Sequence, residues 1–152
     1  MMHTAIIEPR TSAGDVEFVA YGLSLPPGLP SLPRVATGDD TGTLVMHIAP
    51  DRWFAPAASE ATRALLARLT DYGTCVDVTG KWSRIDVTGP NAVAVLSASI
   101  DIRAVLRERA CASVTLFDCP SLVLQLADGY AVWTTSSYRR HLLSEFQRLA
   151  GG

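Results

Sequence analysis

The stretch CVDVTGKWSRIDVTGPNAVAVLS, from Cys75 to Ser97, decides the predicted fold class. Residues 76–79 alternate apolar and polar side chains, and residues 84–88 do so again after the turn dipeptide Gly80-Lys81. A period of two predicts half-buried β-strands. Gly89-Pro90 then opens an apolar run, and the fixed φ of proline suits the first position of a helix. The stretch therefore predicts strand, turn, strand and short helix.

The turn sets which side chains of the two strands face one another. If Gly80-Lys81 is a two-residue hairpin loop, Asp77 lies opposite Arg84. Such a cross-strand ion pair would contribute roughly 0.2–1 kcal/mol. By the same parity, Trp82 and Asp86 share the face of Asp77 and Arg84, away from the core. Tryptophan beside arginine is typical of protein interfaces, so these four residues are the predicted partner interface. The alternative is that Trp82 covers the open edge of the sheet.

The same order of elements recurs along the chain. Leu44–Leu69 can be laid on Leu122–Leu149, because both read as strand, aspartate-containing turn, strand, serine and a helix with a double leucine. With the central unit between them, the pattern is ββα three times over. Strand pairs followed by helices predict an α+β fold, in which an antiparallel or mixed sheet carries its helices on one face as a two-layer sandwich.

The N-terminal part differs in composition from the rest. Four prolines lie between Leu25 and Pro33, where they remove backbone donors and favour extended geometry. We therefore predict an arm or proline-rich linker over residues 1–40 and a single α+β domain over residues 41–152. The leucines between the prolines would pack on this domain or on a partner.

Charge and composition narrow the class of partner. The chain has 152 residues, 48% of them hydrophobic, and a net charge of −2, which gives no basic footprint for nucleic acid. No apolar run approaches the roughly 18 residues that a membrane span needs. The N-terminal sequence shows no basic region followed by an apolar segment, so we expect no signal peptide and a cytoplasmic location.

The sequence offers no catalytic or metal constellation. Three cysteines without a C-x-x-C spacing argue against a disulfide framework or a zinc site, and the three histidines lie far apart. G-x-G-x-x-G, Walker and G-x-S-x-G motifs do not occur. Asp77 and Asp86 could form an acid–base pair, but an ion pair of Asp77 with Arg84 is the simpler interpretation. We therefore predict no catalytic residue and no metal site, and assign no residue to a cofactor.

Several short motifs together resemble one family. Asp77–Thr79, then Ile85–Ala92 and Leu96, resemble the pattern VD(V/L)S…(L/V)xGPDAxxxL of the folate-binding aminomethyltransferase superfamily, which includes the glycine cleavage T-protein. The gamma subunit of heterotetrameric sarcosine oxidase is the more similar member, because its PDxWL turn is matched by Pro50–Phe54. The resemblance covers Leu44–Leu149. Asn91 stands where the family usually has aspartate.

The resemblance implies a role beside larger chains. It implies an accessory, gamma-type subunit, structural rather than catalytic by itself, of a complex that oxidises sarcosine or another N-methyl amine. The partners would be large flavin- and folate-binding subunits carrying FAD, FMN, NAD and tetrahydrofolate, with no cofactor in this chain.

Two other functions fit the sequence. The first is a stand-alone folate- or pterin-binding module of the aminomethyltransferase-like fold, with Asp77 or Asp86 holding the pterin. The second is an unrelated α+β interaction protein that forms a homodimer through the face of Trp82.

Overall fold

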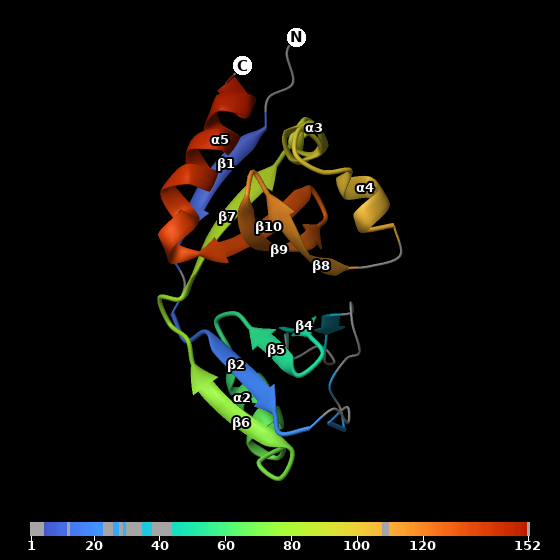
Figure 1. The fold of residues 1–152 in the computed structure, drawn as a ribbon, viewed down its shortest axis with the longest axis vertical. Coiled ribbons are helices and arrows are strands. Elements are labelled where there is room, and N and C mark those ends of the chain that lie inside the picture. The colour runs from blue at the N-terminus through green and yellow to red at the C-terminus, as the bar shows by residue number, and fades with distance from the viewer. Residues whose placement is uncertain are drawn as a thin grey trace. The chain divides into compact units, whose positions relative to one another are not determined.

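The computed structural model describes residues 5–11, 13–22, 26–27, 29, 35–37, 44–107 and 110–151. The chain divides into two compact units, each built on a five-stranded antiparallel sheet (Figure 1). We call Met1–Thr11 with Lys81–Gly152 the terminal unit, and Ser12–Gly80 the inserted unit. The chain thus starts in the terminal unit, forms the inserted unit and then returns.

The sheet of the terminal unit takes strands from both ends of the chain. Its strands, in spatial order, are β1 (Ile6–Arg10), β7 (Trp82–Thr88), β10 (Gly129–Thr135), β9 (Cys119–Leu126) and β8 (Cys111–Leu116). Its helical segments are α3 (Ala92–Ser97), α4 (Ile102–Val105), the 3-10 turn η1 (Ser136–Tyr138) and α5 (Arg139–Gly151).

One face of this sheet carries the core of the terminal unit. Ile85 and Val87 of β7 alternate along the strand and are fully buried, as the period of two predicts. Leu142 and Phe146 of α5 are one helical turn apart and join the same core, because residues at i and i+4 share a helix face. Arg84 and Asp86 consequently lie on the opposite face of the sheet.

The inserted unit is organised in the same way. Its strands, in spatial order, are β3 (Val35–Thr37), β4 (Leu44–Ala49), β5 (Arg52–Ala55), β2 (Val16–Ala20) and β6 (Gly73–Asp77), and its helix is α2 (Glu60–Ala67). Ser59 caps α2, because its Oγ accepts a hydrogen bond from the Thr62 amide at 3.2 Å. Phe18, Trp53 and Leu66 form the centre of the core between sheet and helix.

The α+β fold class is confirmed, but the predicted hairpin at Gly80-Lys81 is wrong. β6 pairs with β2, whereas β7 pairs with β1 and β10. The two strands therefore belong to different sheets, and the expected pairing of Asp77 with Arg84 does not form. β1 and β10 occupy both edges of β7, so β7 has no edge left to pair with β6.

The predicted division of the chain also differs from the compact units. The sequence analysis placed an arm over residues 1–40 and one domain over residues 41–152, a boundary that lies outside the described residues. Within residues 1–40, β1 and β2 are strands of the two sheets and not an arm. Most of the proline-rich stretch also lies outside the described residues, but Leu29 is buried in the core of the inserted unit.

In the part of the chain that the structure describes, no helix is long and apolar enough to cross a membrane.

Candidate interaction surface

The face of the terminal sheet opposite its helices carries a row of charged residues on β1 and β7. Glu8 lies directly opposite Asp86, and Arg10 lies directly opposite Arg84. Like charges in directly opposed positions destabilise an antiparallel pair. This register therefore requires ion pairs along and across the two strands. We call Glu8, Arg10, Arg84 and Asp86 the charge ladder.

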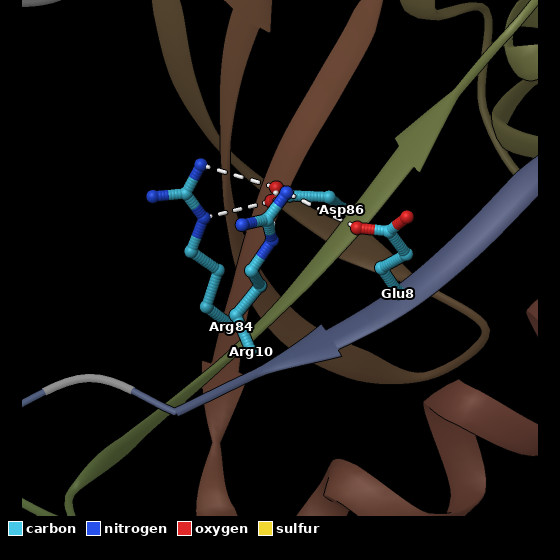
Figure 2. Close-up of polar contacts among 4 residues, drawn as sticks. All are labelled: Glu8, Arg10, Arg84 and Asp86. Carbon is cyan, nitrogen blue, oxygen red and sulfur yellow. Dashed lines mark hydrogen bonds and ion pairs between the residues drawn. The ribbon is translucent and has the colours of Figure 1, made fainter.

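Figure 2 shows how the charge ladder closes around Asp86. The Arg84 guanidinium donates to both carboxylate oxygens of Asp86, from Nε to Oδ1 at 2.7 Å and from Nη2 to Oδ2 at 3.3 Å. Arg10 Nε lies 3.0 Å from Oδ2 of the same carboxylate, and Arg10 Nη2 donates to Glu8 Oε2 at 3.1 Å. Each opposed pair of like charges is thus neutralised by a neighbour of opposite sign.

Burial differs sharply within the charge ladder. The Asp86 side chain is 4% exposed, whereas that of Arg10 is 54% exposed. A buried carboxylate is tolerated when charged hydrogen bonds satisfy its oxygens. Because both oxygens of Asp86 are engaged by guanidinium groups, this side chain links β7 to β1 through ion pairs.

Aromatic rings lie beside the cations on this face of the sheet. The Arg84 guanidinium lies 5.1 Å from the ring centroid of the buried Trp133 on β10, and Lys81 Nζ lies 5.5 Å from the ring of Trp82. Trp82 itself is half-buried and shares the face of Arg84 and Asp86. Cations within about 6 Å of an aromatic ring are attracted to it. Arginine and aromatic side chains together make a composition enriched at protein interfaces.

The structure therefore brings together three of the four residues predicted as an interface and leaves out one. Trp82, Arg84 and Asp86 lie on one face of β7. Asp77 ends β6 in the inserted unit, where its Oδ1 accepts the Thr79 amide at 2.9 Å. Hydrogen bonds from Thr79 lower the pKa of the Asp77 carboxyl. Asp77 is therefore ionised at neutral pH without an arginine partner on the opposite strand.

Asp77 also borders a groove beside α2. The groove has a volume of about 560 Å³ and is lined by residues of α2, β2 and β6, among them Arg63, Leu66, Thr70 and Cys75. Cys75 is exposed at the strand edge, but burial of its thiol on the groove side raises its pKa. The groove lies within the size range of small-molecule sites.

A second cavity of about 460 Å³ lies in the terminal unit. The turn at Gly89-Pro90 and the β9–β10 hairpin line it, together with Tyr130. Burial raises the pKa of the Tyr130 phenol, and the nearby Arg103 partly offsets this. Among the described residues, no group of three or more histidine, cysteine and acidic side chains gathers as a metal site would require.

Sequence reasoning missed Glu8 and Arg10. They alternate with Ile7 and Pro9 in the sequence Ile-Ile-Glu-Pro-Arg, which is a period-two signal, but the run is short and contains a proline, which is unfavourable within a strand. Nothing in the sequence alone indicated that this segment would pair with β7.

A scan against protein-family models and a search of curated proteins each found no match. Among solved structures, the chain is similar to a chain of a heterotetrameric sarcosine oxidase from Corynebacterium sp. U-96, determined in complex with pyrrole 2-carboxylate. The match covers 96% of this chain and 85% of that chain, with a TM-score of 0.73 and 19% sequence identity. The two chains share a fold.

Proposed function

We propose that this chain is an accessory, gamma-type subunit of a flavin-dependent complex that oxidises sarcosine or a related N-methyl amine. The observation that carries the proposal is the fold shared with a sarcosine oxidase chain over 96% of this chain and 85% of the other. Chains that match over nearly their whole lengths are of comparable size, which supports the role of a small subunit. The resemblance of the motif around Gly89-Pro90 to the gamma subunit supports the same assignment.

In this proposal, the redox and one-carbon chemistry belongs to partner subunits. These would bind FAD, FMN, NAD and tetrahydrofolate. The sequence of this chain has no G-x-G-x-x-G motif, the feature that would assign a dinucleotide to it. The charge ladder supports an accessory role, because its one buried carboxylate is already occupied by two guanidinium groups.

We further propose that the charge ladder and Trp82 form the surface that contacts the large subunit. Arg10 is the member that a partner can reach most readily, because over half of its side chain is exposed. Its guanidinium has donors beyond those bound to Glu8 and Asp86, so it can bind a carboxylate or a backbone carbonyl of the partner.

Co-purification from the native host tests the assignment. A tag following Gly152 should recover larger chains, a visible flavin spectrum and bleaching of that spectrum when sarcosine is added. A colourless preparation of this chain alone, under conditions in which it stays folded, would contradict the proposal.

Paired variants test the surface. Arg10→Gln removes the charge of an exposed ion pair at the proposed interface, and we expect about a tenfold loss in affinity for the partner, typical of an interface arginine. Arg148→Gln is the matched control, because Arg148 makes a similarly exposed ion pair with Glu145 on α5. Equal recovery of the partner with both variants would exclude this surface.

A second function is favoured by the position of Asp77. Its carboxylate borders the 560 Å³ groove and stays ionised, so it could accept hydrogen bonds from the amino-pyrimidine edge of a pterin. Titration of the isolated chain with tetrahydrofolate should then give binding heat that Asp77→Asn reduces. If tetrahydrofolate gave no binding heat with the unmodified chain, this second function would be excluded.

A further inference from the structure

The outer edge of the inserted sheet is open at β6. β2 pairs with β6 along its inner side, and no described strand pairs with its outer side. After Gly73, every residue of β6 is exposed, and Val76 is 43% exposed although it is apolar. An open edge presents unpaired N–H and C=O groups to which another strand can add.

The hydrogen bonds at the two ends of the β2–β6 pair show which residues of β6 face outward. The Tyr21 amide donates to the Tyr72 carbonyl at 2.9 Å, and the Val78 amide donates to the Asp15 carbonyl at 3.0 Å. Hydrogen-bonded pairs in an antiparallel ladder recur at every second residue. The even-numbered positions of residues 72–78 therefore direct their backbone groups to β2.

The odd-numbered positions consequently direct theirs to the open edge. Cys75 and Asp77 direct both their N–H and C=O groups outward, whereas Gly73 offers only its carbonyl, because its amide donates to the Leu69 carbonyl at 3.2 Å. A second β6 strand, rotated about a two-fold axis through Cys75, would place the amides of Cys75 and Asp77 opposite the carbonyls of Cys75 and Gly73 of the other copy. Cys75 would face its own copy, and Gly73 would face Asp77 of the other chain.

We propose that β6 is a homodimer interface, at which two copies of this chain join their inserted sheets by antiparallel pairing centred on Cys75. This interface is separate from the charge ladder and does not depend on the proposed oxidase subunit role. It also differs from the homodimer through Trp82 considered from the sequence, because it lies on the other compact unit.

Side chains along β6 fit this register. On one face of the joined strands, Thr74 would lie opposite Val76 of the other copy, and paired β-branched residues stabilise a sheet. The two Asp77 carboxylates would lie four positions apart along the strands, about 13 Å, so like charges do not meet. β6 also contains no proline or lysine of the kind that protects exposed edges.

The groove beside α2 leaves space for the added strand. Cys75 lies opposite Phe18 in the β2–β6 register, so its side chain is on the face that α2 covers. The groove of about 560 Å³ flanks β6 on that side. Side chains of a second strand would therefore enter open volume lined by Leu66 and Ala67 of α2.

Oligomeric state in solution tests the interface with the full chain. Sedimentation equilibrium should give twice the monomer mass of 16.3 kDa. Cys75→Pro removes only an outward N–H and leaves the bonds to β2 intact, so it should yield a monomer with an unchanged circular dichroism spectrum. Val76→Lys, which adds a charge to the edge, should weaken the dimer at least about tenfold.

Cross-linking locates the contact. A short bis-maleimide should join two unmodified chains through Cys75, and Cys75→Ser should remain dimeric but lose the cross-link. Thr115→Lys is the matched control, since Thr115 is an exposed residue of β8, an edge strand of the terminal sheet, and the substitution should leave the dimer intact. A monomeric unmodified chain, or a dimer that Cys75→Pro and Val76→Lys both leave unchanged, would overturn the proposal.

Discussion

Asp86 shows how one buried charge fixes its neighbourhood. Its position on the polar face of β7 followed from the alternation of the sequence, but its burial did not. The carboxylate is buried because guanidinium groups from β1 and β7 satisfy it, and one of these comes from a segment seventy-odd positions earlier in the chain. A charge desolvated in this way is stable only while its partners remain.

We predict that Asp86→Ala destabilises the protein by about 2 kcal/mol. The substitution leaves two guanidinium groups without their shared acceptor, but partial exposure of both arginines reduces the cost below that of a fully buried pair. Urea unfolding measures the effect. Glu8→Ala removes the exposed acid of the charge ladder and should cost less than about 0.5 kcal/mol. If both variants lowered the free energy of unfolding equally, the burial of Asp86 would not contribute to stability.

Cys111 makes the stability of the folded protein depend on pH in the alkaline range. Burial raises the pKa of the Cys111 thiol to about 11, from 9.0. The folded chain therefore holds this proton more tightly than the unfolded chain, so stability is full below pH 9 and falls as pH rises from 9 to 11. Unfolding free energies measured across this range should fall less steeply for Cys111→Ala. If the unfolding free energy fell equally steeply with pH in both proteins, Cys111 would not be the source of this pH dependence.

At the scale of elements, local patterns predicted the strands but not their partners. The alternation in residues 76–79 and 84–88 correctly indicated β6 and β7, because period two is a property of each strand alone. Pairing depends on which edges are available in the folded chain. β1 and β2 lie far from β6 and β7 in sequence, so no local pattern indicates that they pair with them. The alternation within β7 predicted that Trp82, Arg84 and Asp86 share a face, but it could not predict that Glu8 and Arg10 of β1 lie beside them.

Asp128-Gly129 is a dipeptide typical of tight hairpins, and it lies between β9 and β10. The position of this hairpin depends on Gly129. A Cβ at Gly129 would lie 2.2 Å from the Val87 carbonyl oxygen and 2.7 Å from the Thr88 Cα, and its φ is +156°. We predict that Gly129→Ala costs more than about 2 kcal/mol, because backbone atoms of β7 would have to move.

Thermal unfolding of Gly129→Ala checks this expectation. Gly151→Ala is the control, since a Cβ there meets no atom within 4 Å and alanine favours a helix; this variant should be neutral or slightly more stable. A melting temperature for Gly129→Ala equal to that of the control would show that β10 can move away from β7 without cost.

At the largest scale, the fold depends on how segments that are distant in sequence are combined into each unit. The terminal unit consists of two segments separated by the inserted unit. Its five-stranded sheet is complete only when β1, from the first of these segments, pairs with β7 of the second. The fold shared with a sarcosine oxidase chain at 19% identity indicates that this arrangement does not require a particular sequence. Cores of alternating apolar residues tolerate extensive substitution when their pattern is kept.

The dependence of the terminal unit on β1 leads to the last prediction. A chain lacking Met1–Arg10 would lose the strand that pairs with residues 84–88 of β7, together with one guanidinium bound to Asp86. Unpaired backbone groups at the new edge and an incompletely satisfied carboxylate should both weaken the terminal unit. Hydrogen exchange should therefore speed up in β7 and β10, while β2 and β5, which pair within the inserted unit, keep their protection. Unchanged protection in β7 would show that β1 is dispensable, and that the charge ladder does not hold the two segments of the terminal unit together.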